Sequence, residues 1–313
     1  MKSSRRSAQP ASRWMGFIGA ALLGAAPVCA NAQPADLYYE RAVMVAADQR
    51  CGLFAPEVAA ALAAGTAQAR GAALRAGTSP EILRQTERAA AVKAAAFDCR
   101  SSDVATVASR VKTAFAGYAK ITRLTYAGDV AGWAADKNVG RSVRWSLAQE
   151  TRFGADRMVF GLAGREGAPG SVSSGLVASA SFADGAQPYA ARIVLRDTSR
   201  AGQPYLARWG SGATAGLALS QRLPPASAQR AFTATARSPS DPELLPHLPT
   251  GKTTTFGWAF RFPEAAAQEL ARLDPREAVA VDFLFPGDVT RRAYVEVGDF
   301  AAGRAFLAVS IGR

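Results

Sequence analysis

The cysteines and the histidine of this chain are the first residues to consider for chemistry. After residue 32 the sequence contains two cysteines, Cys51 and Cys99, and one histidine, His247. A dithiol oxidoreductase usually has a CxxC pair, a cysteine nucleophile needs a nearby histidine, and zinc needs three or four ligands. The spacing matches none of these patterns, so we expect no metal site and no cofactor. In an oxidising compartment, two cysteines of this kind form a structural disulfide.

His247 is the one side chain that could serve as the base of a Ser-His-Asp triad. It lies in "SPSDPELLPHLPTGK", whose four prolines predict a long extended loop. The chain lacks the G-x-S-x-G motif of a serine nucleophile. The stretch Gly251-Lys252-Thr253 does not complete a P-loop, because Pro246 stands where that motif needs its first glycine. His247 is therefore a catalytic candidate whose alternative is an ordinary loop residue.

Two carboxylates lie inside predicted strands. Asp282 is in "AVAVDFLF" and Glu296 is in "YVEVGDF". If these strands are neighbours, the two side chains could form the acid pair that glycoside hydrolysis requires. The alternative is that both are ordinary polar residues on the outward face of half-buried strands.

The elements that carry these residues fall into two regions. Residues 33–125 contain four stretches of helix-forming residues, separated by short breaks at glycine, proline and serine. In the last stretch Val104, Val107, Val111 and Phe115 recur every three or four residues and predict one buried stripe. If the four helices run up and down in turn, the first and third end on the same side. That arrangement allows Cys51 and Cys99 to approach within the Cα separation of about 7 Å that a disulfide needs.

From residue 140 to residue 313 the hydrophobic period changes to two, which is typical of half-buried strands. Eight stretches show it: "SVRWSLAQ", "RMVFGLAG", "SGLVASASF", "YAARIVLR", "TTTFGWAFRF", "AVAVDFLF", "AYVEV" and "AFLAVS". A short helix is predicted at 263–273, between two prolines. The sequence therefore predicts the α+β class, with a disulfide-clamped helical bundle followed by an antiparallel β-sandwich-like domain.

Residues 126–139 form the predicted connecting segment between the two regions. This stretch is polar and contains glycines, so we expect its aromatic residues to be exposed. Tyr126 and Trp133 are therefore candidate binding residues.

The first 32 residues have the features of a cleaved signal peptide. Four basic residues precede the apolar stretch "WMGFIGAALLGAAPV", and Ala30-Asn31-Ala32 supplies a small-x-small cleavage site. Removing these residues takes the formal charge from +12 to +8, because four lysines and arginines and no acids are lost. We expect a periplasmic or secreted protein with no transmembrane segment after cleavage. Its basic residues are dispersed rather than clustered, so we expect no nucleic-acid partner.

These observations favour an exported, non-catalytic envelope or secreted module that binds a polymer or protein partner. The alternative function is a periplasmic or secreted hydrolase that acts on envelope polysaccharide or peptide through carboxylates of the β region. A third hypothesis is an assembly or chaperone component whose helical half docks a partner, and a large exposed apolar patch on the helices would favour it.

Overall fold

The computed structural model describes residues 33–137, 144–164, 175–206, 214, 216–246 and 255–309. The predicted signal peptide lies outside the described residues. Residues 33–313 belong to one unit, in which four helices precede the strands. The described α-helices are α1 (Pro34–Cys51), α2 (Pro56–Arg75), α3 (Pro80–Ala95), α4 (Ser102–Ala119), α5 (Glu264–Leu270) and α6 (Phe300–Ala308).

Local sequence explains where the first helices begin and end. Proline occupies a first-turn position of α1, α2 and α3, where its missing N–H costs nothing. Ser79 caps α3 by accepting a hydrogen bond from the backbone N–H of Ile82. Helix α1 ends at Gly52, which has a left-handed backbone with φ of 61° that glycine adopts without strain.

The predicted disulfide is confirmed. Cys51 is the last residue of α1, and Cys99 lies four residues beyond the end of α3. Their Cα atoms are 5.6 Å apart. Helices α1 and α3 also pack against each other, so the disulfide joins two elements that are already neighbours.

The strands form two antiparallel sheets. The seven-stranded sheet has the order β1-β2-β3-β4-β5-β9-β8, and the four-stranded sheet has the order β11-β10-β6-β7. This architecture confirms the predicted α+β class. The strands are β1 (Arg123–Tyr126), β2 (Trp133–Asp136), β3 (Arg144–Phe153), β4 (Asp156–Gly164), β5 (Leu176–Ser181), β6 (Ala190–Arg196), β7 (Gln229–Thr233), β8 (Ala236–Pro239), β9 (Trp258–Phe262), β10 (Ala278–Phe285) and β11 (Val289–Glu296).

The two sheets share one apolar core, to which Leu147, Phe160 and Phe283 contribute. The simple alternation expected for β3 is interrupted, because a β-bulge lies between Trp145 and Leu147. Leu147 belongs to the main core, whereas Trp145 packs on a separate cluster that includes Leu244. The bulge therefore places these two apolar residues in different clusters.

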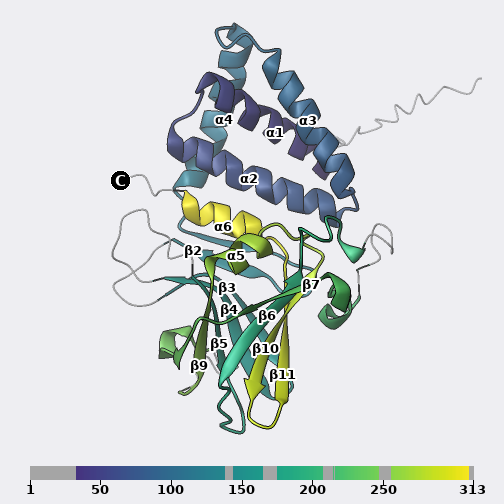
Figure 1. Ribbon diagram of the computed structural model, residues 1–313. Helices are drawn as coiled ribbons and strands as arrows, with labels where there is room; N and C mark the ends of the chain where they lie inside the picture. Colours follow the sequence, from purple (N-terminus) through teal and green to yellow (C-terminus); the bar gives the residue numbers. More distant parts are fainter. Residues whose placement is uncertain are drawn as a thin grey trace, which may run out of the picture. The chain divides into compact units, whose positions relative to one another are not determined.

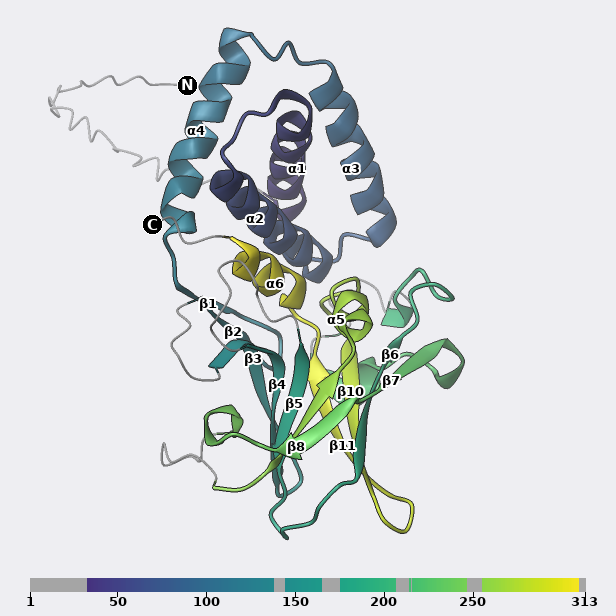
Figure 2. The same cartoon turned by 60° about the vertical axis from the view of Figure 1, so that its left-hand side comes forward.

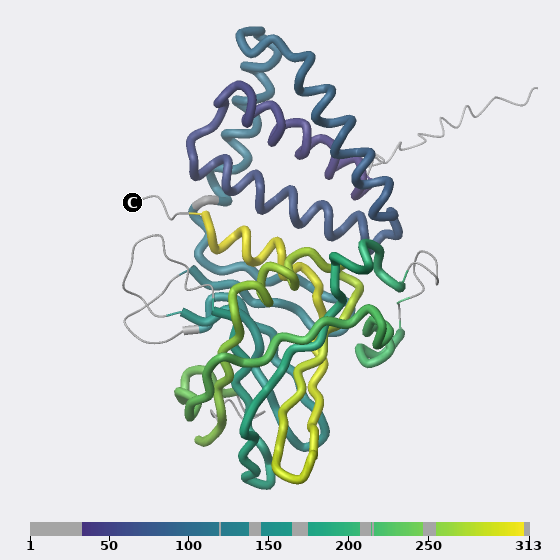
Figure 3. The backbone as a smooth tube through the Cα atoms, viewed as in Figure 1, coloured from purple at the N-terminus to yellow at the C-terminus, as the bar shows by residue number. Residues whose placement is uncertain are grey.

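The prediction of a strand at "AFLAVS" is wrong, because its first four residues, 305–308, belong to helix α6. Phe300 and Phe306 are fully buried. Helix α6 packs against α2 and against β2 and β3, so it lies between the first helices and the sheets (Figure 1). Arg75 of α2 donates two hydrogen bonds, of 2.6 and 2.9 Å, to the carboxylate of Asp299 just before α6. Figure 3 traces this return of the chain as the yellow segment beside α2. None of the described helices has the length and hydropathy needed to cross a membrane.

Candidate binding site

An apolar groove lies between helices α1 and α4. Its volume is about 420 Å³. Leu62 of α2 is fully buried at its base. Twelve described residues line the groove: Leu37, Tyr39, Glu40, Arg41, Val43, Met44, Leu62, Lys93, Phe97, Val107, Val111 and Phe115.

The groove exists because α4 is only partly packed. Helix α4 contacts α2, while α3 packs on α1, and Figure 2 shows α4 and α3 diverging on either side of α1. The stripe predicted on α4 is present, but the prediction that it is buried is wrong for part of its length. Val104 is buried, whereas Val107 is 41% exposed and Val111 and Phe115 are half-buried. The stripe therefore forms one wall of an open groove.

Arg41 places a charge inside this apolar surface. Its Nη1 donates a hydrogen bond to the carbonyl oxygen of Gly65, and its guanidinium lies 5.9 Å from the centre of the Phe115 ring. A Cβ atom at Gly65 would stand 2.9 Å from the Phe115 ring, so glycine permits this close approach. Burial lowers the pKa of Arg41 from its ordinary value, but a guanidinium stays charged in proteins.

The charges around the groove are unbalanced. Arg41 and Lys93 form no ion pair with any part of the chain that the structure describes. Glu40 is the one carboxylate among the lining residues. An apolar surface with a half-buried cation is suited to a ligand that combines apolar and anionic parts.

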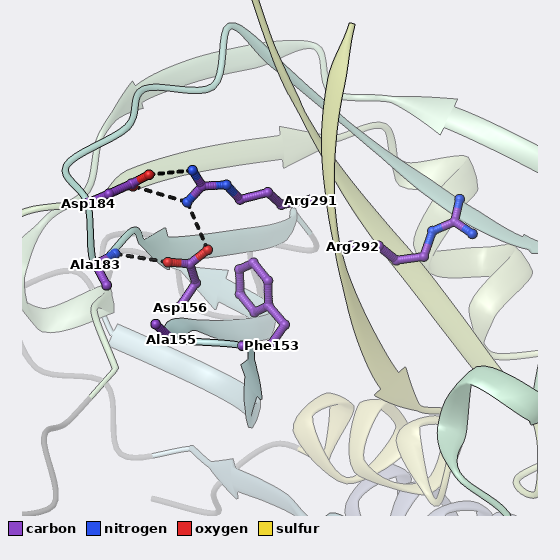
Figure 4. A pocket seen from close by; sticks show the side chains of 8 residues that line it. Phe153, Ala155, Asp156, Ala183, Asp184, Arg291 and Arg292 are labelled. Carbon is purple, nitrogen blue, oxygen red and sulfur yellow. Dashed lines mark hydrogen bonds and ion pairs between the residues drawn. The ribbon is translucent and has the colours of Figure 1, made fainter.

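A second pocket, of about 400 Å³, lies where β3 joins β4. Arg291 of β11 donates a 3.1 Å hydrogen bond to Asp156 and also pairs with Asp184 (Figure 4). These hydrogen bonds, together with one from the backbone N–H of Ala186, lower the pKa of Asp184 to about 2. The charged groups of this pocket therefore form ion pairs with one another, whereas Arg41 pairs with no described carboxylate.

Asp282 lies on the sheet face opposite the core, as predicted from the alternation of β10. It is fully buried by two arginines: Arg192 donates a 3.0 Å hydrogen bond, and Arg292 donates bonds of 2.6 and 2.9 Å. Burial opposes ionisation of this carboxyl, but the hydrogen bonds from both arginines outweigh it and lower its pKa. An ionised carboxylate held by two arginines is poorly suited to donate a proton.

Glu296 is also fully buried, at the end of β11. Its Oε1 accepts a 2.7 Å hydrogen bond from the backbone N–H of Asp129. Its Oε2 accepts bonds of 2.8 Å from the N–H groups of Val130 and Ala131. These three donors belong to the turn between β1 and β2, so the carboxylate holds that turn against β11.

The structure does not bring Asp282 and Glu296 together as an acid pair. Their strands are neighbours, but Glu296 stands opposite Ala278, four residues from Asp282 along β10. At a rise of roughly 3.3 Å per residue this offset is about 13 Å. Glycosidase carboxylates lie roughly 5 to 9.5 Å apart. The environments of Asp282 and Glu296 and the distance between them both favour structural roles for these two residues.

The expectation that Tyr126 and Trp133 are exposed is wrong, because they are only 1% and 0% exposed. Trp133 donates through Nε1 to the carbonyl oxygen of Val297 at 3.0 Å, and its ring lies 5.1 Å from that of Phe300. Tyr126 donates to the carbonyl oxygen of Ala302 at 3.3 Å. Helix α6 covers both aromatics, and the sequence pattern did not predict that helix.

His247 lies outside the described residues. Within the described ranges, no group of three or more histidine, cysteine, aspartate or glutamate side chains is arranged to hold a metal ion. Arg41 was missed in the sequence, although one feature pointed to it. Arg41 lies four residues after Leu37 and three before Met44, so the three side chains share one helix face. Arg41 is a charged residue at a position of that face where an apolar residue is expected.

We compared the chain with known families, curated proteins and solved structures. No family model and no curated protein matches the chain, and no solved structure matches it either.

Proposed function

We propose that this protein is an exported, non-catalytic module that binds a partner component of the cell envelope or its surroundings. The groove between α1 and α4 is the binding site. The observation that carries the proposal is the exposed part of the α4 stripe, where Val107, Val111 and Phe115 face an open cavity of about 420 Å³. Contiguous apolar surface of this kind is retained on soluble proteins mainly where something binds.

Two further features support an exported protein. The sequence begins with a segment typical of a signal peptide. The Cys51–Cys99 disulfide suits an oxidising compartment. Together they support a periplasmic or secreted location.

The hydrolase alternative receives less support from the geometry. Asp282 is held by two arginines, and Glu296 is held by three backbone N–H groups. Neither carboxylate lines the groove between α1 and α4, the pocket where β3 joins β4, or the pocket beside α2 and α6. The groove itself is walled mainly by apolar side chains, which bind but do not catalyse.

Site-specific photo-cross-linking in the producing cells tests the proposal. A photoreactive amino acid is placed at Val107, which is 41% exposed on the groove. The matched control is Val92, a valine of α3 that is 71% exposed and does not line the groove. We expect a discrete adduct from position 107 and none from position 92.

Both positions lie on helices and both are accessible to solvent. Because Val92 is the more exposed of the two, unspecific collisions should give more adduct at Val92 than at Val107. An adduct of equal yield at both positions, or no adduct at Val107, would contradict binding through the groove. Recovery of the chain in the cytoplasm with residues 1–32 still attached would contradict the exported location.

A further inference from the structure

The groove has the size of a small-ligand site rather than that of a protein interface. A standard protein interface uses about 20 to 30 residues on each side. Twelve described residues line this groove, and its volume of about 420 Å³ falls within the range of roughly 300 to 1,000 Å³ for small-molecule pockets. The size therefore favours one apolar chain over a partner helix.

The lining residues of the groove extend along α4. Phe115, whose ring meets Arg41, is the last of them on this helix. Phe97 precedes α4, and Arg50 in the last turn of α1 donates a hydrogen bond to its carbonyl oxygen. Val107 and Phe115 are eight residues apart on α4, which is about 12 Å at a rise of 1.5 Å per residue. A site of this shape suits an extended hydrocarbon chain.

Arg41 supplies a half-buried positive charge in the groove. A guanidinium has five N–H donors, and one hydrogen bond from Arg41 to a described residue is found, to Gly65. No described carboxylate pairs with it. Its planar fork can donate two parallel hydrogen bonds to a carboxylate. Lys93 adds a second positive charge, although it is exposed and so contributes less.

We propose that the groove binds a single-chain anionic amphiphile, a long-chain carboxylate, with its head on Arg41 and its tail along Val111 and Met44 toward Phe97. This inference rests on the proposed function, since it names the ligand of the same groove. The chain beyond residue 32 carries a formal charge of +8, which also favours an anionic ligand over a second copy of the protein.

Calorimetric titration of the purified, disulfide-bonded protein with decanoate and dodecanoate, below their micellar concentrations, tests the inference. Each buried methylene should improve the affinity roughly fourfold, so dodecanoate should bind about fifteenfold tighter than decanoate. Dodecyltrimethylammonium has the same tail and a cationic head. We expect it to bind at least tenfold more weakly than dodecanoate.

Two variants, each compared with a second substitution, locate the site. Arg41→Gln should remove the preference for dodecanoate over the cationic amphiphile, while Lys93→Gln should change the dodecanoate affinity less than threefold. Val107→Glu, which puts a like charge on an exposed part of the groove, should weaken dodecanoate binding at least tenfold, and Val92→Glu should not. Glutamate is a better helix former than valine, so both valine variants should fold.

Three results would overturn the inference: no saturable binding of dodecanoate, equal affinity for the anionic and cationic amphiphiles, or unchanged binding by Val107→Glu. A protein adduct from Val107 combined with failure to bind dodecanoate would leave the proposed function standing. That outcome would make a partner protein the occupant of the groove. Failure of both experiments would overturn the binding role as well.

Discussion

Replacing Glu296 by glutamine distinguishes a structural carboxylate from a catalytic one. The side chain accepts three hydrogen bonds, of 2.7, 2.8 and 2.8 Å, from consecutive backbone N–H groups. A glutamine can direct its oxygen toward two of these donors, and its amide group then faces the third. The variant therefore leaves one buried donor unpaired and turns two charge-assisted hydrogen bonds into neutral ones.

The cost follows from these changes. An unsatisfied buried donor costs roughly 1 to 3 kcal/mol, and a hydrogen bond to a charged group is worth about 1 kcal/mol more than a neutral one. We expect Glu296→Gln to lower the free energy of unfolding by about 3 kcal/mol. For a unit of this size that corresponds to a decrease in Tm of roughly 6 to 12 °C.

Urea unfolding followed by circular dichroism measures this effect, with Glu264→Gln as the matched control. Glu264 on α5 is 42% exposed and pairs with Arg304 at 2.8 Å. An exposed pair is worth less than about 1 kcal/mol, so the control should remain close to the wild type. A Glu296→Gln variant within about 0.5 kcal/mol of the wild type would refute the structural role and would restore Glu296 as a candidate acid.

Three other perturbations test parts of the fold. Replacing Cys51 and Cys99 by alanine should lower the free energy of unfolding by about 4 kcal/mol in the chain-entropy model, and an unchanged urea midpoint would contradict the clamp. Because the folded-state pKa of Asp282 is lowered, its ionised form stabilises the fold above the ordinary aspartate pKa of about 3.9. That contribution is lost as the pH falls through the folded-state pKa, so Asp282→Asn should lose less stability on acidification than the wild type, and an equal loss would argue against it. Glu277 forms two hydrogen bonds, of 2.9 and 2.8 Å, with Arg196, and both side chains are only 3% exposed. Glu277→Gln leaves that guanidinium without its negatively charged partner and should cost about 3 to 5 kcal/mol by urea unfolding; a cost below 1 kcal/mol would contradict this.

Local patterns in the sequence predicted the helices, the long strands and the disulfide, because each depends on periodicity or on helix ends. They failed where an element is short. Strand β8 has four residues and ends at Pro239, which is typical of an edge strand but gives no alternation to detect. The apolar run after Phe300 has too few residues to separate a strand from a helix.

The errors at the candidate site have the same origin in tertiary structure. Trp133 is buried because α6 packs over it, whereas its place in a polar stretch that contains glycines indicates exposure. Val107 belongs to a correctly predicted apolar stripe, yet periodicity cannot show that α4 diverges from α3. Arg41 becomes notable only when Gly65 and Phe115 are seen to meet it. Such contacts between distant segments are set by packing.

Native mass spectrometry of the protein purified without denaturant from the producing cells shows whether the groove holds a ligand. We expect the mature wild-type chain to carry a non-covalent ligand and Val107→Glu to lose it. We also expect Val92→Glu, altered outside the groove, to retain the same ligand mass. Retention of the ligand by Val107→Glu, or a wild-type chain that carries no ligand, would contradict the claim that the groove between α1 and α4 is the binding site.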